Sequence, residues 1–161
     1  AVSYGVTGPN LRGSGVKWDI RKDEPYSIYD KFDFNIPVGA GKMGTVGDCW
    51  DRYFVRMVEM KESVKITRQA LKGIPAGDVH QTLPKKIRPP QGSIYKRTES
   101  PRGDLAYYIV SEGSPIPYRL KMRSPAFTAL SVLGEISQGW MMSDVLVILG
   151  SLDIVLGEID R

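Results

Sequence analysis

The feature that most constrains the fold of this chain is a stripe of mostly apolar residues, spaced three and four positions apart, between residues 48 and 72. That spacing places the stripe on one face of a single long helix. The stripe consists of Tyr53, Met57, Met60, Val64, Thr67 and Leu71. Suitable capping and terminating residues flank it, namely Asp48 or Asp51, Gly73 and Pro75. We expect Met57 and Met60 to fill the core, because methionines at helical spacing usually do so.

The remaining pattern predicts an α+β fold with this long amphipathic helix, a small antiparallel sheet and C-terminal helices. Residues 1–47 show no sustained helical period, so short extended pieces are expected, including a half-buried strand over residues 32–36. Residues 73–92 hold four prolines and three glycines and predict an extended surface crossing. Strands are expected over residues 94–98, 105–110 and 118–122, and helices over 127–137 and 143–149.

The charge of the chain is unevenly divided. Residues 1–123 hold 21 basic and 13 acidic residues, whereas residues 124–161 hold one basic and five acidic residues. A basic body can bind nucleic acid or an acidic protein surface. Because the basic residues do not gather into a patch, we expect a solvated or partner-facing surface and no nucleic acid. A non-catalytic basic interaction domain stays as an alternative.

Cysteine and histidine are too scarce for a metal site built by this chain alone. The chain has one cysteine, Cys49, and one histidine, His80, whereas zinc and iron–sulfur sites need three or four ligands. His80 lies in the proline-rich crossing, where a general base would be poorly held. Cys49 at a helix start could have a lowered pKa, but packing against Trp50 is the preferred interpretation. We therefore expect no metal and no catalytic residue.

A glycine motif and an apolar C-terminal run have ordinary explanations. The spacing of Gly39, Gly41 and Gly44 matches a dinucleotide fingerprint, but the long helix occupies the place of the second strand that the fingerprint requires. A loop is therefore expected there.

The most apolar stretch, residues 141–159, is interrupted by three acidic residues, so no segment is expected to cross a membrane.

Two carboxylates stand out within that apolar run. Asp153 and Glu158 lie in GSLDIVLGEIDR, which otherwise has the composition of a buried segment. Buried carboxylates cost free energy unless they are paired or hydrogen-bonded. They are therefore candidates for a site or for structural ion pairs. An ion pair with Arg161 as counterion is preferred from spacing alone.

Four phrases, in order and over almost the whole chain, resemble the C-terminal part of the D subunit of respiratory complex I, the NADH:quinone oxidoreductase. They are GPNLRGSGVKWDIRKDEPYSIYDKFDF, GDCWDRYFVRMVEMKESVKI, SPRGDLAYYIVSEGSPIPYRLKMRSPAF and LVILGSLDIVLGEIDR. That family resembles the large subunit of nickel–iron hydrogenases, whose membrane-bound members end near Asp-Pro-Cys-x-x-Cys-Thr-Asp-Arg. Asp153, Asp160 and Arg161 match that ending, whereas Val155 and Glu158 stand at the cysteine positions. Because neither side chain can replace a bridging thiolate, the resemblance implies a metal pocket turned into a pocket for an apolar molecule, quinone.

The resemblance implies a site in the last residues of the chain. Asp153 would lie near the quinone headgroup as a polar or ionisable group, and Val155 would form an apolar wall. Leu156 and Glu158 would add to the lining, and a structural ion pair would join Asp160 and Arg161. No cofactor is expected on this chain, because the iron–sulfur cluster that reduces quinone lies in a partner subunit of the family.

The resemblance also implies that residues 1–161 are the C-terminal part of a longer, hydrogenase-large-subunit-like domain. The chain alone would not be catalytic, and it would expose a surface that the missing part of the same polypeptide covers. Its expected partners are quinone and the other hydrophilic and membrane subunits of an NAD-binding, proton-translocating enzyme. Its expected location is peripheral, on the cytoplasmic face of the inner (plasma) membrane. The same subunit in a ferredoxin- or F420-linked relative is the alternative within the family.

Overall fold

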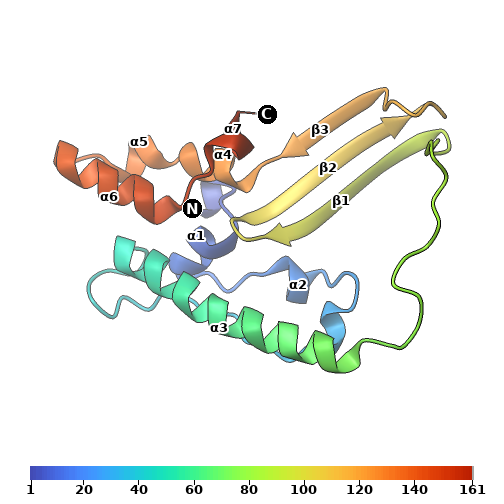
Figure 1. Ribbon diagram of the computed structural model, residues 1–161. Coiled ribbons are helices and arrows are strands. Elements are labelled where there is room, and N and C mark those ends of the chain that lie inside the picture. Colours follow the sequence, from blue (N-terminus) through green and yellow to red (C-terminus); the bar gives the residue numbers. More distant parts are fainter. Residues whose placement is uncertain (161) are drawn as a thin grey trace.

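The computed structural model describes residues 1–160, and its elements combine a three-stranded antiparallel sheet with helices. Figure 1 shows α1 and α2 between the sheet and α3, with the C-terminal helices beyond one end of the sheet. The predicted α+β class is confirmed. In chain order the elements are η1 (Val2–Tyr4), α1 (Gly8–Gly13), α2 (Ile20–Asp23), η2 (Tyr29–Lys31), α3 (Cys49–Gly73), β1 (Gly92–Ser100), β2 (Gly103–Ser111), β3 (Arg119–Arg123), α4 (Pro125–Leu130), α5 (Leu133–Ile136), α6 (Met142–Leu152) and α7 (Leu156–Ile159).

The long helix α3 forms where the sequence predicts it, but its apolar stripe does not face the core. The Asp48 side chain caps the helix by accepting a hydrogen bond from the Asp51 N–H at 2.8 Å. The prediction that Met57 and Met60 fill the core is wrong, because these side chains are 39% and 53% exposed. The helix instead packs against α1 and α6, and Val55 is buried with 1% exposure. Helical spacing shows which residues share a face, but not which face a neighbouring element covers.

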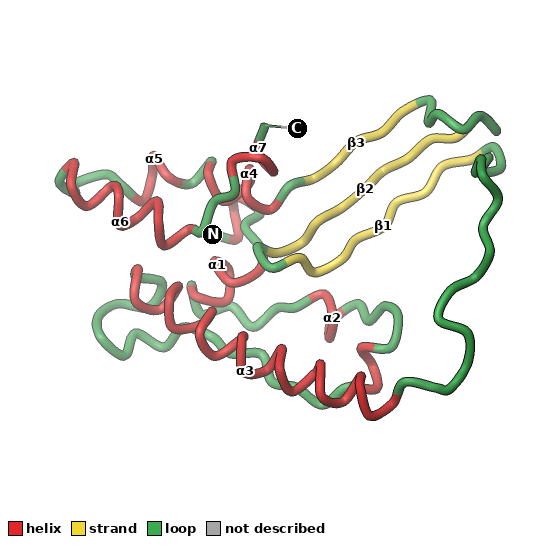
Figure 2. The backbone as a smooth tube through the Cα atoms, viewed as in Figure 1, coloured by secondary structure: helices red, strands yellow, loops and turns green. Residues whose placement is uncertain are grey.

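The predicted sheet is confirmed, with each strand shifted or extended by a few residues. β1 and β2 form a hairpin that closes at the pair Ser100 and Gly103, and β3 pairs with the other edge of β2. The predicted crossing is also confirmed. Residues 74–91 are exposed and form no helix or strand, and Figure 2 shows them as a long loop from the end of α3 to the start of β1.

The N-terminal region differs from its prediction, because short helices rather than extended pieces occupy much of it. Helix α1 is buried along its whole length, and its Leu11 forms a hydrophobic cluster with Val6 and Val132. Residues 32–36 alternate in burial as predicted, but they form no strand. Side chains of α3 bind this backbone instead: the Asp33 N–H donates to Gln69 Oε1 at 2.9 Å. Such side-chain hydrogen bonds satisfy backbone groups that would otherwise pair with a neighbouring strand.

The C-terminal helices also depart from their predicted bounds. A turn at residues 131–132 divides the helix expected over 127–137 into α4 and α5. The helix expected over 143–149 runs further, from Met142 to Leu152. None of the helices in residues 1–160 has the combination of length and apolar character needed to cross a membrane.

The glycine-rich loop before α3 serves close packing. The Gly39 N–H donates to the Arg12 carbonyl at 2.8 Å, which brings the loop against the end of α1. A Cβ on Gly39 would lie 2.0 Å from the Gly13 carbonyl oxygen and 2.8 Å from Asp51 Oδ2. Residues 1–38, all of which the structure describes, form no strand, so the prediction of a loop in place of a dinucleotide site is confirmed.

Gly39→Ala should therefore destabilise the protein by about 1–3 kcal/mol, because the methyl group has no space without a backbone shift. Gly134→Ala is the matched control, since a Cβ there meets no heavy atom within 4 Å. Urea denaturation of the purified full-length subunit measures both changes. Equal stability of the two variants would show that the contact between the loop and α1 contributes little.

Candidate functional site

Asp153 occupies an unusual backbone position at the end of α6. Its φ of 56° and ψ of 56° are left-handed, a conformation that Asp tolerates better than most residues. Its N–H donates to the Gly150 carbonyl at 3.1 Å and closes the helix. The chain then leaves α6 in a new direction, so the following residues reach α7 over the end of the sheet.

Two arginines hold the Asp153 carboxylate. Arg102, in the turn of the β1–β2 hairpin, donates from Nη2 to Oδ1 at 3.1 Å and from Nε to the Asp153 carbonyl at 3.2 Å. Arg56 of α3 places Nε 3.6 Å from Oδ2 and donates to the Ser151 and Leu152 carbonyls. The Asp153 side chain stays 39% exposed. The carboxylate is thus fixed between two cations and still accessible.

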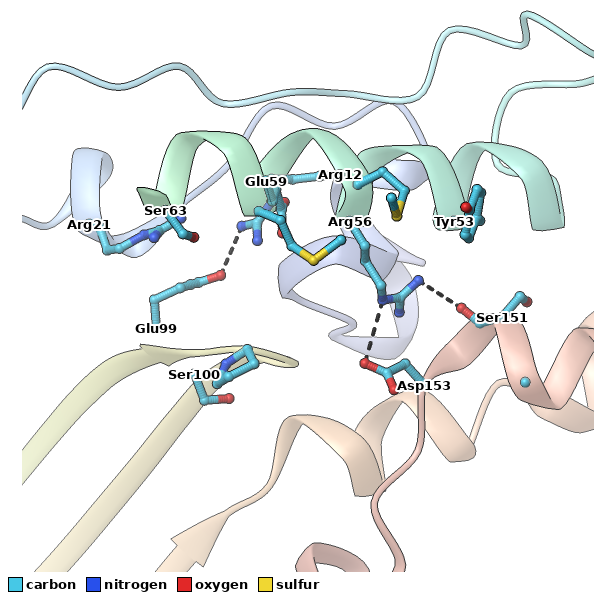
Figure 3. A pocket seen from close by; sticks show the side chains of 14 residues that line it. Arg12, Arg21, Tyr53, Arg56, Glu59, Ser63, Glu99, Ser100, Ser151 and Asp153 are labelled. Carbon is cyan, nitrogen blue, oxygen red and sulfur yellow. Dashed lines mark hydrogen bonds and ion pairs between the residues drawn. The ribbon is translucent and has the colours of Figure 1, made fainter. Parts of the chain in front are cut away.

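A cavity of about 560 Å³, here called the Asp153 cavity, opens beside this carboxylate. Figure 3 shows Arg56 between Ser151 and Asp153 on one side, and Glu99 and Arg12 on the other. The exposed stripe of α3 contributes part of the wall, so the methionines that the sequence assigned to the core line this cavity. Its lining residues are Arg12, Arg21, Tyr53, Arg56, Met57, Glu59, Met60, Ser63, Glu99, Ser100, Pro101, Gly150, Ser151 and Asp153.

Val155 lines a second cavity of about 340 Å³, here called the Val155 cavity. Leu105, Tyr107 and Met122 of the sheet line it, together with the charged residues Arg102 and Glu158. Ser100 and Pro101 line both cavities, so the hairpin turn forms their common wall.

The other predicted residues lie in different surroundings. Glu158 Oε1 accepts hydrogen bonds from Ser124 Oγ at 2.7 Å and from the Ala126 N–H at 3.2 Å, which holds α7 against the start of α4. Leu156 is 77% exposed and lines neither cavity. Asp160 is exposed, and its predicted partner Arg161 lies outside the described residues.

A buried cluster of charges forms the end of the Asp153 cavity furthest from Asp153. The guanidinium of Arg12 donates to Glu59 and Glu99 and lies 3.3 Å from Asp19. Burial raises the pKa of Glu99 to about 6, although the charge of Arg12 acts in the opposite direction. Burial also opposes the ionisation of Asp19, but hydrogen bonds and charge from Arg21, together with the charge of Arg12, lower its pKa.

Sequence reasoning did not identify Arg12, Arg56, Glu99 and Arg102 as site residues. Arg12, Arg56 and Arg102 lie within the phrases that carry the family resemblance, and Glu99 directly precedes one of them. Nothing in the local sequence pattern shows that a charged residue is buried, because its burial depends on distant segments. For Arg12 a weak signal exists in the neighbouring glycines. A Cβ on Gly8 would lie 2.4 Å from the Cα of Gly103, so α1 can pack under the hairpin only with glycine there.

His80 and Cys49, which the sequence analysis also considered, line neither cavity. His80 is exposed in the crossing, and Cys49 Sγ accepts a hydrogen bond from Arg52 Nη2 at 3.2 Å. Among residues 1–160, no three His, Cys, Asp or Glu side chains are grouped so that they could hold a metal ion. The geometry therefore places two cavities side by side, with the turn of the β1–β2 hairpin as their common wall.

Comparison with known proteins gives the family. The family described as "Respiratory-chain NADH dehydrogenase, 49 Kd subunit" matches residues 1–90 and 80–161, so the chain belongs to this family. It is 50% identical over 161 residues to a D subunit of the NADH-quinone oxidoreductase of Anaeromyxobacter dehalogenans. It is 51% identical over 165 residues to the D subunit of the Chlorobaculum tepidum enzyme, and 45% identical over 161 residues to that of Dehalococcoides mccartyi. All of the chain is covered in each case, but only 41–42% of each relative.

Arg56 should keep the C-terminal segment attached to α3, because its guanidinium donates to the Ser151 carbonyl at 2.8 Å and to the Leu152 carbonyl at 3.2 Å. In Arg56→Met, the local opening of residues 150–156 should become easier by about 2–4 kcal/mol, since buried acceptors lose a charged donor. Hydrogen exchange by mass spectrometry measures this. Arg68→Met, on the exposed face of the same helix, is the control and should leave the exchange unchanged.

Proposed function

We propose that this chain forms part of the quinone site of an NADH:quinone oxidoreductase. The observation that carries the proposal is the placement of Asp153 and Val155, which are two residues apart and line two adjoining cavities with a common wall. Six charged residues line the Asp153 cavity, whereas the lining of the Val155 cavity is mainly uncharged, with Arg102 and Glu158 as its two charged residues. A quinone has polar carbonyl oxygens on an apolar ring and tail, so it needs both kinds of surface. The names of the relatives, NADH-quinone oxidoreductases, support the same substrate.

The residues of the chain have distinct tasks in this proposal. Quinone takes up two electrons and two protons and becomes quinol, and the electrons come from an iron–sulfur cluster in a partner subunit. Arg56 and Arg102 hold the Asp153 carboxylate in place, and their positive charges stabilise negative charge that develops on a nearby quinone oxygen. Val155, Leu105 and Met122 supply apolar wall that excludes water from the ring.

The assignment extends to the domain and its surroundings. Residues 1–161 are the C-terminal part of a longer domain, and the rest of that domain covers the part of the α3 stripe beyond the Asp153 cavity. Two observations support this: the chain spans about two fifths of the length of the curated relatives it matches, and Val64 and Leu71 are 51% and 66% exposed. Its partners are the other hydrophilic and membrane subunits, and its location is peripheral, on the cytoplasmic face of the inner membrane. The basic body of the chain then contacts other subunits.

Val155→Trp in the full-length subunit should lower quinone reductase activity in native membranes by about tenfold or more. The indole ring would occupy the Val155 cavity and displace the quinone from its reacting position. Ferricyanide reduction, which takes electrons upstream of the site, and assembly on native gels should stay normal. Sensitivity to quinone-site inhibitors should also change.

Val79→Trp is the matched control, because Val79 is 97% exposed in the crossing and lines neither cavity. It should behave as wild type in all four measurements. If Val155→Trp also behaves as wild type, Val155 is ordinary packing, and the quinone site must be built from other parts of the enzyme.

A further inference from the structure

Glu99, near the end of β1, has one carboxylate oxygen that accepts no hydrogen bond from the described residues. Its side chain is only 4% exposed, and Oε1 accepts a hydrogen bond from Arg12 Nη1 at 2.8 Å. Oε2 is buried and has no hydrogen-bond partner within residues 1–160. A buried carboxylate oxygen without a partner is costly while the group is ionised, and it is a ready position for a proton.

The position of Glu99 connects it with Asp153. Both residues line the Asp153 cavity, with Glu99 at the Arg12 end and Asp153 at the Arg56 end (Figure 3). The cavity volume of about 560 Å³ is sufficient for a file of water molecules, each of which needs about 30 Å³. Ser100 and Glu59 supply polar groups along its wall, so water would find partners there.

We propose that Glu99 is a proton-carrying residue that passes protons through the Asp153 cavity to the Asp153 end of the site. The inference rests on the proposed function, which supplies the two electrons. As quinone takes up two electrons and two protons to become quinol, one proton comes from solvent, and the other leaves the Glu99 carboxyl group and travels along water to the quinone oxygen beside Asp153. Glu99 remains as a carboxylate and takes a new proton from solvent.

The groups around Glu99 permit this role near neutral pH. Arg12 of α1 and Arg21 of α2 favour the ionised form, whereas Asp19, which caps α2, and burial favour the protonated form. Glu59 of α3 is held by Arg12 on the same side of the cavity. The resulting pKa of Glu99, about 6, means that the carboxyl group is protonated below this pH and loses its proton as the pH rises through it.

The test compares Glu99→Gln with wild type, in the full-length subunit in native membranes, over about pH 5 to 8. Glutamine keeps an oxygen for Arg12 but cannot release a proton. Quinone reductase activity should fall by about tenfold or more, and the titration step near pH 6 should disappear from its pH profile, while ferricyanide reduction persists. A pH profile with the same step as wild type would overturn the proposal.

Glu62→Gln is the matched control, because it removes a carboxylate of α3 that lines neither cavity and leaves Glu99 in place. A purely structural role for Glu99 predicts the same pH profile for both variants, and that result would overturn the proposal. If Glu99→Gln fails to assemble, Glu99→Asp keeps the carboxylate and is used instead. A displaced titration step supports the proposal, and an unmoved step overturns it.

Infrared spectroscopy of the purified enzyme separates this inference from the function on which it rests. A protonated carboxyl band that titrates near pH 6 in wild type and is missing in Glu99→Gln assigns the proton to Glu99 without any turnover. Absence of such a band would overturn the inference, even if Val155→Trp shows the expected loss. If the Glu99 band is present but Val155→Trp behaves as wild type, the protonated Glu99 stands and the proposed quinone site is wrong.

Discussion

The fold depends on one buried cation, the guanidinium of Arg12. This side chain is 2% exposed, and three carboxylates surround it: Asp19 at the start of α2, Glu59 on α3 and Glu99 on β1. Because each acid belongs to a different element, the cation fixes the distance between the long helix and the hairpin. Loss of such a centre leaves buried charges without a partner, which costs about 3–5 kcal/mol. The Asp153 cavity exists because these elements are held apart at that distance.

The same cavity is polarised from end to end. Around Arg12 three carboxylates meet two guanidinium groups, those of Arg12 and Arg21, and among these neighbours the charge of Asp19 adds to the effect of burial on the pKa of Glu99. At the opposite end two arginines, Arg56 and Arg102, share the single carboxylate of Asp153. A molecule that gains electrons is stabilised at the cationic end, and protons are most readily held at the acidic end. The order of charges along the cavity thus suits a reaction that joins electron and proton uptake.

The sequence predicted the elements whose apolar residues repeat at regular spacing. It missed the features that depend on contacts between distant segments. The spacing of the α3 residues and the alternation in β1–β3 were sufficient to predict those elements. The period could not show that Met57 lines a cavity, because that depends on which face α1 and α6 cover. Asp153 was found because a carboxylate in an apolar run is costly. Arg56 and Glu99 were missed because their partners lie far away in the sequence.

The crossing at residues 74–91 can vary in length without altering either cavity. No residue of this segment lines either cavity, and its side chains are exposed. Doubling the length of such a connection costs only about 0.6 kcal/mol in loop entropy. Length differences between species should therefore accumulate here, and an affinity tag or a fluorescent protein inserted here offers a handle for following assembly of the intact enzyme.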